Sequence, residues 1–160
     1  MGAYPRMIAV AAVLLVASAV AVRAQATDPA VGTWKLDAAK STYEPGPAPK
    51  SVLNIVEPAG GKGYKVSVDA VRADGTPAKW SFTSEADGTD VPVRNNPEFE
   101  TAALTRLSPT TATTVYKKAG KTVATVKSTV SADGKTLTSI TTGTAPGGQA
   151  IHNVAVYTKQ

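Results

Sequence analysis

Apolar and polar residues alternate along most of the chain after residue 27. The segment 64–71 reads Tyr, Lys, Val, Ser, Val, Asp, Ala, Val, and in 79–84 the aromatic residues Trp80 and Phe82 share one face. No window repeats apolar residues at the i, i+3, i+4, i+7 spacing of an amphipathic helix over three turns. A period of two, with abundant Thr and Val, is typical of half-buried strands. The pattern therefore predicts an all-β domain.

Turn signals divide the alternating segments at regular intervals. Ala-Asp-Gly occurs at 73–75, 86–88 and 132–134, and Asp-Gly between alternating segments is a strong hairpin signal. We expect an antiparallel up-and-down meander of about eight to ten strands. The expected strands are 32–36, 51–57, 64–72, 78–85, 98–107, 112–118, 122–131, 136–143 and 150–158, with 91–94 as an optional short tenth.

Such a meander would leave two exposed edges if it stayed flat. Closure into a β-barrel removes the edges, whereas the alternative, a β-sandwich, needs longer crossovers than these tight turns provide. Two irregular segments interrupt the pattern: 37–50, with prolines at 45, 47 and 49, and 90–97. Loops of this length in a compact domain are often functional, so we expect 37–50 to be a crossing loop or lid.

The first 26 residues have the features of a cleavable signal peptide. Arg6 precedes an apolar run at 7–22, and Ala24 and Ala26 supply the small-x-small pattern that signal peptidase recognises. The run is shorter than the roughly 20 residues that span a bilayer, which makes a retained anchor the weaker alternative. We expect cleavage after Ala26, or after Ala24 in a second frame. Residues 27–160 would then form one domain in the periplasm or the medium, with no stable membrane anchor.

Composition excludes several kinds of site. The 160 residues include no cysteine, so disulfides, thiolate metal ligands, cysteine nucleophiles and a lipid-modified cysteine are excluded. The net charge is +5, and it falls to +3 without residues 1–26, which hold two arginines and no acid. The lysines are scattered, whereas nucleic-acid binding needs a clustered basic surface. We therefore expect no nucleic-acid partner.

The segment Gly32-Thr33-Trp34 resembles the Gly-x-Trp signature of lipocalins and the wider calycin group. The chain also resembles secreted bacterial lipocalin-like proteins of unassigned function, through GTWKLD at 32–37, KS at 40–41 with PAPKS at 47–51, VSADGKTL at 130–137 and VAVYTKQ at 154–160. The resemblance implies a calycin-like barrel in which Gly32 and Trp34 form a structural plug at the closed end, while the other end admits an apolar ligand. It also implies a late arginine packed across the Trp. The last two strands contain none, and Arg106 lies too early, so Lys159 is the candidate substitute.

Catalytic chemistry has little support in the residues. His152 is the only histidine, and no Gly-x-Ser-x-Gly motif accompanies it. One histidine and dispersed acids do not provide three or four convergent metal ligands. We therefore predict no catalytic residue, metal or cofactor. One enzymatic hypothesis remains, in which Asp69, Glu85, Glu98 and Glu100 meet in the barrel mouth and perform acid–base chemistry.

The remaining hypothesis is ligand binding inside the barrel. Alternation gives interior candidates, namely Val66, Val68, Ala70, Trp80, Phe82, Val123, Thr125, Ile151 and Asn153. We expect the ligand to contact Val66, Val68, Trp80, Phe82, Phe99, Tyr116 and Tyr157. The predicted function is binding of a small hydrophobic or amphipathic molecule by an exported barrel. The alternatives are a secreted interaction or inhibitor protein with a filled barrel and, less favoured, the carboxylate-dependent enzyme.

Overall fold

A computed structural model describes residues 27–160, and the predicted signal peptide lies outside the described residues. The described chain forms eleven strands and one short 3-10 helix. They are β1 (Gly32–Leu36), η1 (Ala38–Lys40), β2 (Thr42–Glu44), β3 (Ser51–Pro58), β4 (Tyr64–Val71), β5 (Pro77–Ser84), β6 (Asp87–Pro92), β7 (Thr101–Ser108), β8 (Thr111–Lys118), β9 (Lys121–Val130), β10 (Thr136–Thr144) and β11 (Ala150–Lys159). No helix among them has the length and hydrophobicity to cross a membrane.

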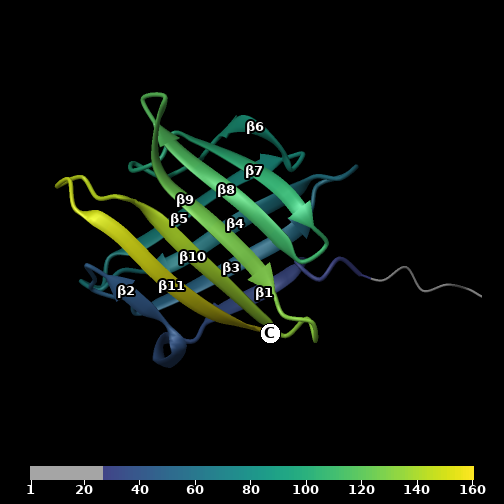
Figure 1. Ribbon diagram of the computed structural model, residues 1–160, viewed down its shortest axis with the longest axis horizontal. Coiled ribbons are helices and arrows are strands. Elements are labelled where there is room, and N and C mark those ends of the chain that lie inside the picture. The colour runs from purple at the N-terminus through teal and green to yellow at the C-terminus, as the bar shows by residue number, and fades with distance from the viewer. Residues whose placement is uncertain (1–26) are drawn as a thin grey trace, which may run out of the picture.

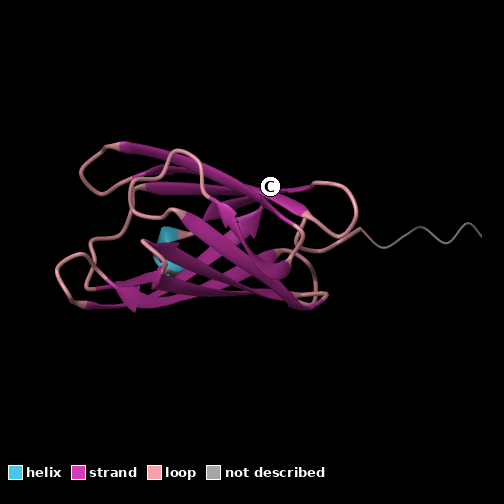
Figure 2. Cartoon of the chain, turned by 90° about the horizontal axis from the view of Figure 1, so that it is seen from above, coloured by secondary structure: helices cyan, strands magenta, loops and turns pink. Residues whose placement is uncertain are grey.

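The strands form one antiparallel sheet that curves into a nearly closed barrel (Figure 1). Their order in the sheet is β5-β4-β3-β1-β11-β10-β9-β8-β7-β6, so two meanders meet where β1 pairs with β11. Seen from above, strands enclose the interior on two sides and loops gather at the two ends (Figure 2). The predicted all-β antiparallel meander is confirmed, and it is a barrel rather than a sandwich.

The barrel has one weak seam, between β5 and β6. An isolated bridge joins Ser81 of β5 to Arg94, just after β6: the Arg94 nitrogen donates to the Ser81 oxygen at 2.8 Å, and the Ser81 nitrogen donates to the Arg94 oxygen at 3.2 Å. Phe82 of β5 is buried with Ala102 and Leu104 of β7 in a cluster that crosses this seam. Side-chain packing therefore closes the barrel where backbone pairing is sparse.

The chain between β1 and β3 is more ordered than the sequence predicts. The segment 37–50, expected as one irregular loop, contains η1 and the short strand β2, which raises the strand number to eleven. Tyr43 of β2 pairs with Asn153 of β11. A three-residue strand is stabilised mainly by its distant partner, and local alternation over three residues cannot indicate it.

The Asp87-Gly88 sequence does not form the predicted hairpin. It lies at the start of β6, where the pairing with β7 shifts register between Asp87 and Asp90. Gly88 has φ +88°, and a Cβ atom there would lie 2.9 Å from the Thr105 Oγ1 atom. The glycine therefore serves a β-bulge rather than a two-residue turn. After β6 the chain remains irregular until Thr101, so Phe99 lies in a loop and not in the strand expected at 98–107.

Trp34 lies at the junction of the two meanders. Its side chain is 0% exposed and packs in the main core cluster, and its Nε1 atom donates to the Ala30 oxygen at 2.9 Å. Lys159 pairs with Trp34 across β1 and β11. The Lys159 ammonium lies 5.0 Å from the Trp34 ring centre and donates to the Pro29 oxygen at 3.1 Å. Lys159 thus lies over the Trp ring, where the resemblance implies an arginine.

Gly32 makes room for this arrangement. Its φ of +143° is one that L side chains rarely adopt, and a Cβ atom would lie 2.6 Å from the Lys159 Cε atom. A residue with a side chain would therefore strain the backbone and displace the lysine from Trp34.

We predict that Gly32→Ala lowers the free energy of unfolding by about 1–3 kcal/mol, because backbone strain adds to the loss of the Lys159 contacts. Urea denaturation followed by circular dichroism measures the change. Gly147→Ala is the matched control, since Gly147 has no positive φ and no atom lies within 4 Å of the position that its added methyl group would take. Equal stability of the two variants would contradict the role given to Gly32.

Candidate ligand-binding cavity

The barrel encloses a cavity of about 480 Å³. Its wall is mostly apolar and is built from the inward-facing positions of β3, β4, β5, β7, β8, β9 and β10. The apolar wall residues on these strands are Val52, Val56, Val66, Val68, Ala70, Ala78, Trp80, Phe82, Leu104, Ala112, Ala124, Val126 and Leu137. Many are alanine or valine, and such small side chains leave space that larger ones would fill. The interior is therefore hollow.

The seven residues expected to contact a ligand all line this cavity. They are Val66, Val68, Trp80, Phe82, Phe99, Tyr116 and Tyr157. Local alternation places the members on β4 and β5, and Phe99 reaches the cavity from the loop before β7. The structure thus brings the set together, and its contact with a ligand stays a prediction.

The interior assignment of β9 is wrong by one residue. Val123 and Thr125 were expected inside, but Ala124 and Val126 line the cavity. Both faces of β9 carry valine and small residues, so hydrophobicity alone does not distinguish them. Lys127 is exposed and lies on the same face of β9 as Val123 and Thr125. Its charge indicates that this face is the outer one.

The first residues of β11 pair with β2 and lie outside the cavity wall. Ile151 and Asn153, also expected inside, lie on the same face as Tyr157 but are absent from the cavity wall. The Asn153 Oδ1 atom instead accepts a hydrogen bond from the Glu44 nitrogen at 3.1 Å. Asn153 therefore supports the β2–β11 contact.

An aromatic group lies in the cavity beside the β5–β6 seam. Tyr116 of β8 meets Phe82 edge-on at a centroid distance of 6.1 Å and stacks on Phe99 at 4.6 Å. The loop that carries Phe99 is held by Asn96, whose Oδ1 atom accepts hydrogen bonds from the Glu98 and Phe99 nitrogens at 2.7 and 3.2 Å. Phe99 is therefore a cavity residue whose loop is held in place by the Asn96 side chain.

Several polar groups in the wall are uncharged, among them the Trp80 indole and the phenols of Tyr43, Tyr116 and Tyr157. The Nε1 atom of Trp80 is buried and makes no hydrogen bond within the described chain. Burial raises the pKa of Tyr116 to about 12, although the neighbouring Trp80 indole opposes that change. Burial also raises the pKa values of Tyr157 and Tyr43. All three phenols therefore keep their protons at neutral pH.

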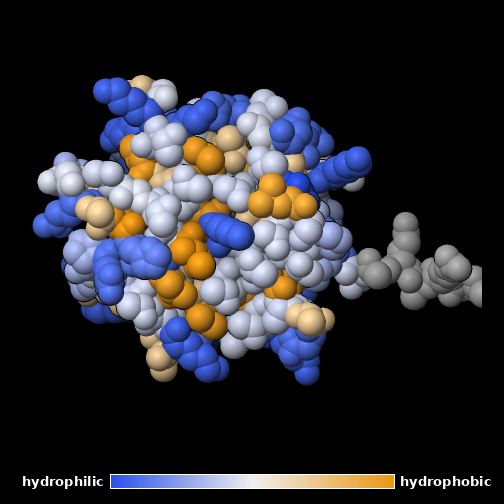
Figure 3. All heavy atoms as spheres, viewed as in Figure 1, coloured by the Kyte–Doolittle hydropathy of each residue, from blue (hydrophilic) through white to orange (hydrophobic). Residues whose placement is uncertain are grey.

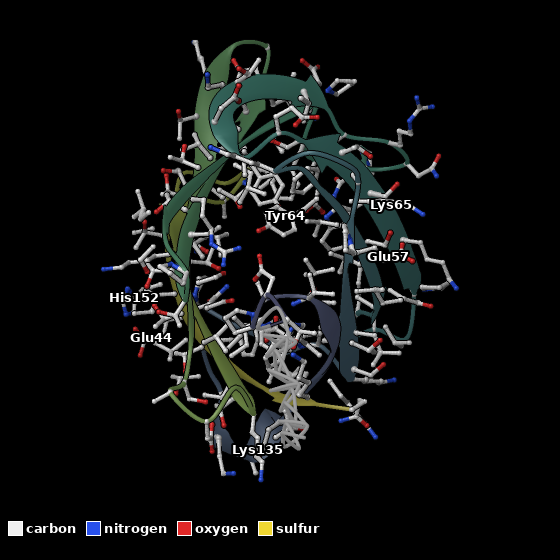
Figure 4. The ribbon with its side chains drawn as sticks, turned by 90° about the vertical axis from the view of Figure 1, so that its right-hand side faces the viewer. Glu44, Glu57, Tyr64, Lys65, Lys135 and His152 are labelled. Carbon is white, nitrogen blue, oxygen red and sulfur yellow. The ribbon has the colours of Figure 1, made fainter. Side chains whose placement is uncertain are left out.

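One end of the cavity is closed by an ion pair that sequence reasoning missed. Arg106 of β7 binds both carboxylate oxygens of Asp28, through Nη1 at 3.0 Å and Nη2 at 2.9 Å. The Tyr64 hydroxyl donates to the same carboxylate and accepts from Arg106 Nη1 at 2.6 Å. Figure 4 views the barrel from this end, with Tyr64 pointing into the interior. Asp28 comes from the segment before β1, so this cluster fixes the entering chain against β4 and β7.

The cluster shifts two pKa values in opposite directions. Burial acts to raise the pKa of Asp28, but hydrogen bonds from Arg106, Tyr64 and the Ala30 nitrogen outweigh it and leave that pKa below its usual value. Burial and the hydrogen bond to Asp28 raise the pKa of Tyr64. Asp28 is therefore ionised and Tyr64 protonated at neutral pH. Nothing in the local pattern around Asp28 signals this contact.

The opposite end carries a more exposed ion pair. Arg72, which follows β4, contacts Glu98 of the loop before β7 at 2.9 Å, and both side chains are nearly half exposed. Both residues border the cavity, together with Pro49 and Asn96. This end is therefore the mouth of the cavity.

The expected cluster of acids does not form. Asp69 lies on the outer wall in an ion pair with Lys79 at 2.7 Å, and Glu100 accepts from the Ala119 nitrogen at 2.8 Å. Glu98 faces Arg72 instead of another acid, and Glu85 lies beside the glycines at 61 and 63. The hypothesis that these four carboxylates converge is wrong.

His152 also lies apart from the cavity. It is exposed on the outer wall and pairs across the strands with Glu44 (Figure 4). Within residues 27–160, no group of three or more His, Cys, Asp or Glu side chains is arranged to hold a metal ion.

We predict that Asp28→Asn destabilises the protein near pH 7 by about 1.5–3 kcal/mol, the range for hydrogen bonds to charged groups. A carboxylate whose pKa is lowered by folding stabilises the folded state above its ordinary pKa, about 3.9, and loses that effect as the pH falls through the folded-state pKa. The difference in free energy of unfolding between wild type and variant should therefore shrink below about pH 4. Urea denaturation across this pH range measures it.

The exposed pair Glu57–Lys65, at 3.3 Å, supplies the control for this experiment. Glu57→Gln removes an acid from the outer wall, where ion pairs contribute about 0–1 kcal/mol. A difference from wild type as large and as pH-dependent as that of Asp28→Asn would contradict a special role for the Asp28 cluster.

Comparison with known proteins bears on the fold. No protein-family model and no curated protein matches the sequence. Among solved structures, the crystal structure of the wild-type fluorescent protein UnaG is similar, with a TM-score of 0.52 and 15% identity over 81% of this chain and 96% of that one. A point mutant of UnaG has a TM-score of 0.53 and 16% identity, over 82% of this chain and 96% of that one. The siderocalin Ex-FABP has a TM-score of 0.43 and 15% identity, over 82% of this chain and 74% of that one. The similarity to the two UnaG structures therefore shows a calycin-like barrel fold.

Proposed function

We propose that this barrel binds a small hydrophobic or amphipathic molecule in its interior. The observation that carries the proposal is the cavity of about 480 Å³ with a mostly apolar wall. Ligand sites are typically cavities of roughly 300–1,000 Å³ with apolar walls and a few polar groups, and this cavity falls within that range. A filled barrel, the premise of the inhibitor alternative, would have no such space.

Burial of apolar surface supplies the driving force. Each Å² of apolar surface removed from water contributes about 25 cal/mol, and valine, alanine and aromatic side chains surround a bound molecule on most sides. The Arg72–Glu98 ion pair at the mouth is exposed, and exposed pairs contribute at most about 1 kcal/mol. The loop it holds can therefore separate from β4 at low cost to admit a ligand.

The outer surface is a weaker candidate for the same role. On the face that Figure 3 shows, a narrow band of apolar groups runs between polar and charged side chains. Ile140, one of the exposed large apolar residues, pairs with Val154 on one side and with Lys127 on the other. An apolar ligand would bury less surface there than inside the barrel.

The same proposal includes export of the chain. The apolar run at 7–22 and the Ala24 and Ala26 pattern support delivery to the periplasm or the medium. The barrel would then meet its ligand outside the cytoplasm.

We predict that the full chain, expressed in a bacterium, is recovered outside the cytoplasm with its N-terminus at Thr27. Intact-mass spectrometry of the secreted or periplasmic protein measures the cleavage position. Ala26→Asp places a charge at the cleavage site and should leave the precursor uncut, or move the cut to follow Ala24. Recovery of an uncut wild-type chain in the cytoplasm would contradict the export proposal.

We predict that the purified barrel binds N-phenyl-1-naphthylamine, whose fluorescence rises in apolar surroundings. Val126→Phe should weaken binding by about tenfold or more, because the added ring occupies the space that the ligand needs. Val123→Phe is the matched control, since it makes the same substitution on the outer face of the same strand and should leave affinity unchanged.

Fluorescence titration measures both variants after circular dichroism confirms their folds. Equal affinity of Val126→Phe and wild type would place the probe outside the cavity. Absence of probe binding by wild type, with no copurifying small molecule in native mass spectra, would contradict the proposed function.

A further inference from the structure

The charged groups at the cavity already have partners. The charged residues in its wall are Arg72, Glu98 and Arg106. Arg72 faces Glu98 at 2.9 Å, and Arg106 binds both oxygens of Asp28. A charged ligand group entering the cavity would therefore find no free counter-charge, and burial of an unpaired charge is strongly unfavourable.

One buried donor in the wall makes no well-directed hydrogen bond, although the Tyr116 hydroxyl lies close enough to interact with it. The Trp80 Nε1 atom is buried and makes no hydrogen bond within residues 27–160. An indole N–H is a donor only, so an oxygen or nitrogen acceptor is the group that satisfies it. Buried donors nearly always have partners, and leaving one unpaired costs free energy that a ligand acceptor would recover.

The surroundings of Trp80 define the shape of the complementary ligand. Trp80 pairs with Val68 in the middle of β5, and the Tyr116 phenol lies nearby with its proton retained. Phe82 and Phe99 flank Tyr116, so apolar rings surround this polar position. The polar wall groups here are therefore neutral donors set among hydrocarbon.

We propose that the ligand is an uncharged hydrophobic molecule whose carbonyl or ether oxygen accepts a hydrogen bond from Trp80 Nε1. This inference rests on the proposed function and specifies the class of ligand for the same cavity. The hydrocarbon part of the molecule lies against the valines of β4 and β9, and the Arg72–Glu98 and Arg106–Asp28 pairs stay intact.

Three ligands of nearly the same shape test this inference. They are 2-acetylnaphthalene, which has a neutral acceptor, 2-isopropenylnaphthalene, which has none, and 2-naphthoate, which is an anion. Displacement of N-phenyl-1-naphthylamine from the wild-type barrel at neutral pH measures their affinities. We expect the ketone to bind about 3- to 10-fold more tightly than the hydrocarbon, the range of one net hydrogen bond. The carboxylate should bind at least about tenfold more weakly than the ketone.

Two variants assign the preference to Trp80. Trp80→Phe removes the donor and keeps an aromatic ring, so the ketone and the hydrocarbon should then bind with equal affinity. Phe82→Leu changes the same wall without altering a donor, so affinities should shift together while the ketone preference persists. Because the measured quantity is a ratio of affinities, a modest change in cavity shape does not imitate the result. If Trp80→Phe fails to fold, the wild-type ratios still decide.

The outcomes separate this inference from the proposed function. Binding of the probe with no preference for the ketone, or with displacement by none of the three ligands, overturns the inference and leaves a hydrophobic site. Tighter binding of the carboxylate also overturns it, because the anion would then displace Asp28 from Arg106 or Glu98 from Arg72. Absence of binding by both probe and ligands contradicts the proposed function itself.

Discussion

Backbone pairing between β1 and β11 joins the two meanders into one barrel, and the other features of the molecule depend on it. The pair brings together residues at opposite ends of the described chain, such as Trp34 and Lys159. Contacts between residues so distant in sequence cost more chain entropy than a hairpin does. Side-chain packing at the junction offsets that cost: Trp34 is fully buried, and Lys159 lies over its ring. Gly32 is required because a side chain there would occupy the space of the lysine.

Closure also determines what the interior can contain. A closed sheet directs every second side chain inward, and in this sequence many of those side chains are small, as at Ala70, Ala112 and Ala124. The same small residues that make the barrel hollow reduce the packing available to stabilise it. Compensating contacts lie at the edges of the cavity, in the Trp34 cluster and in the Phe82 cluster that closes the β5–β6 seam.

Sequence patterns predict the parts of this structure that depend on neighbouring residues. Alternation is local, and it places Val66, Val68, Trp80 and Phe82 on the inner wall with the correct register. It fails for β9, where valine occurs on both faces and an error of one residue reverses every side chain. It cannot reveal the Arg106–Asp28 contact, because the partners are separated by 78 positions and neither lies in a distinctive local pattern.

The contacts that close the barrel at its two ends also control its electrostatics. Asp28 attaches the entering chain to Arg106, and Glu98 attaches the mouth loop to Arg72, so each arginine of the wall is neutralised by the contact that orders a segment. If either arginine lacked its partner, the cavity would present an unpaired cation and favour an anionic ligand. With both partners present, the buried side-chain donor that stays without a hydrogen bond within residues 27–160 is the neutral Trp80 indole. Ordering of the two ends and preference for an uncharged ligand are therefore consequences of one arrangement of charges.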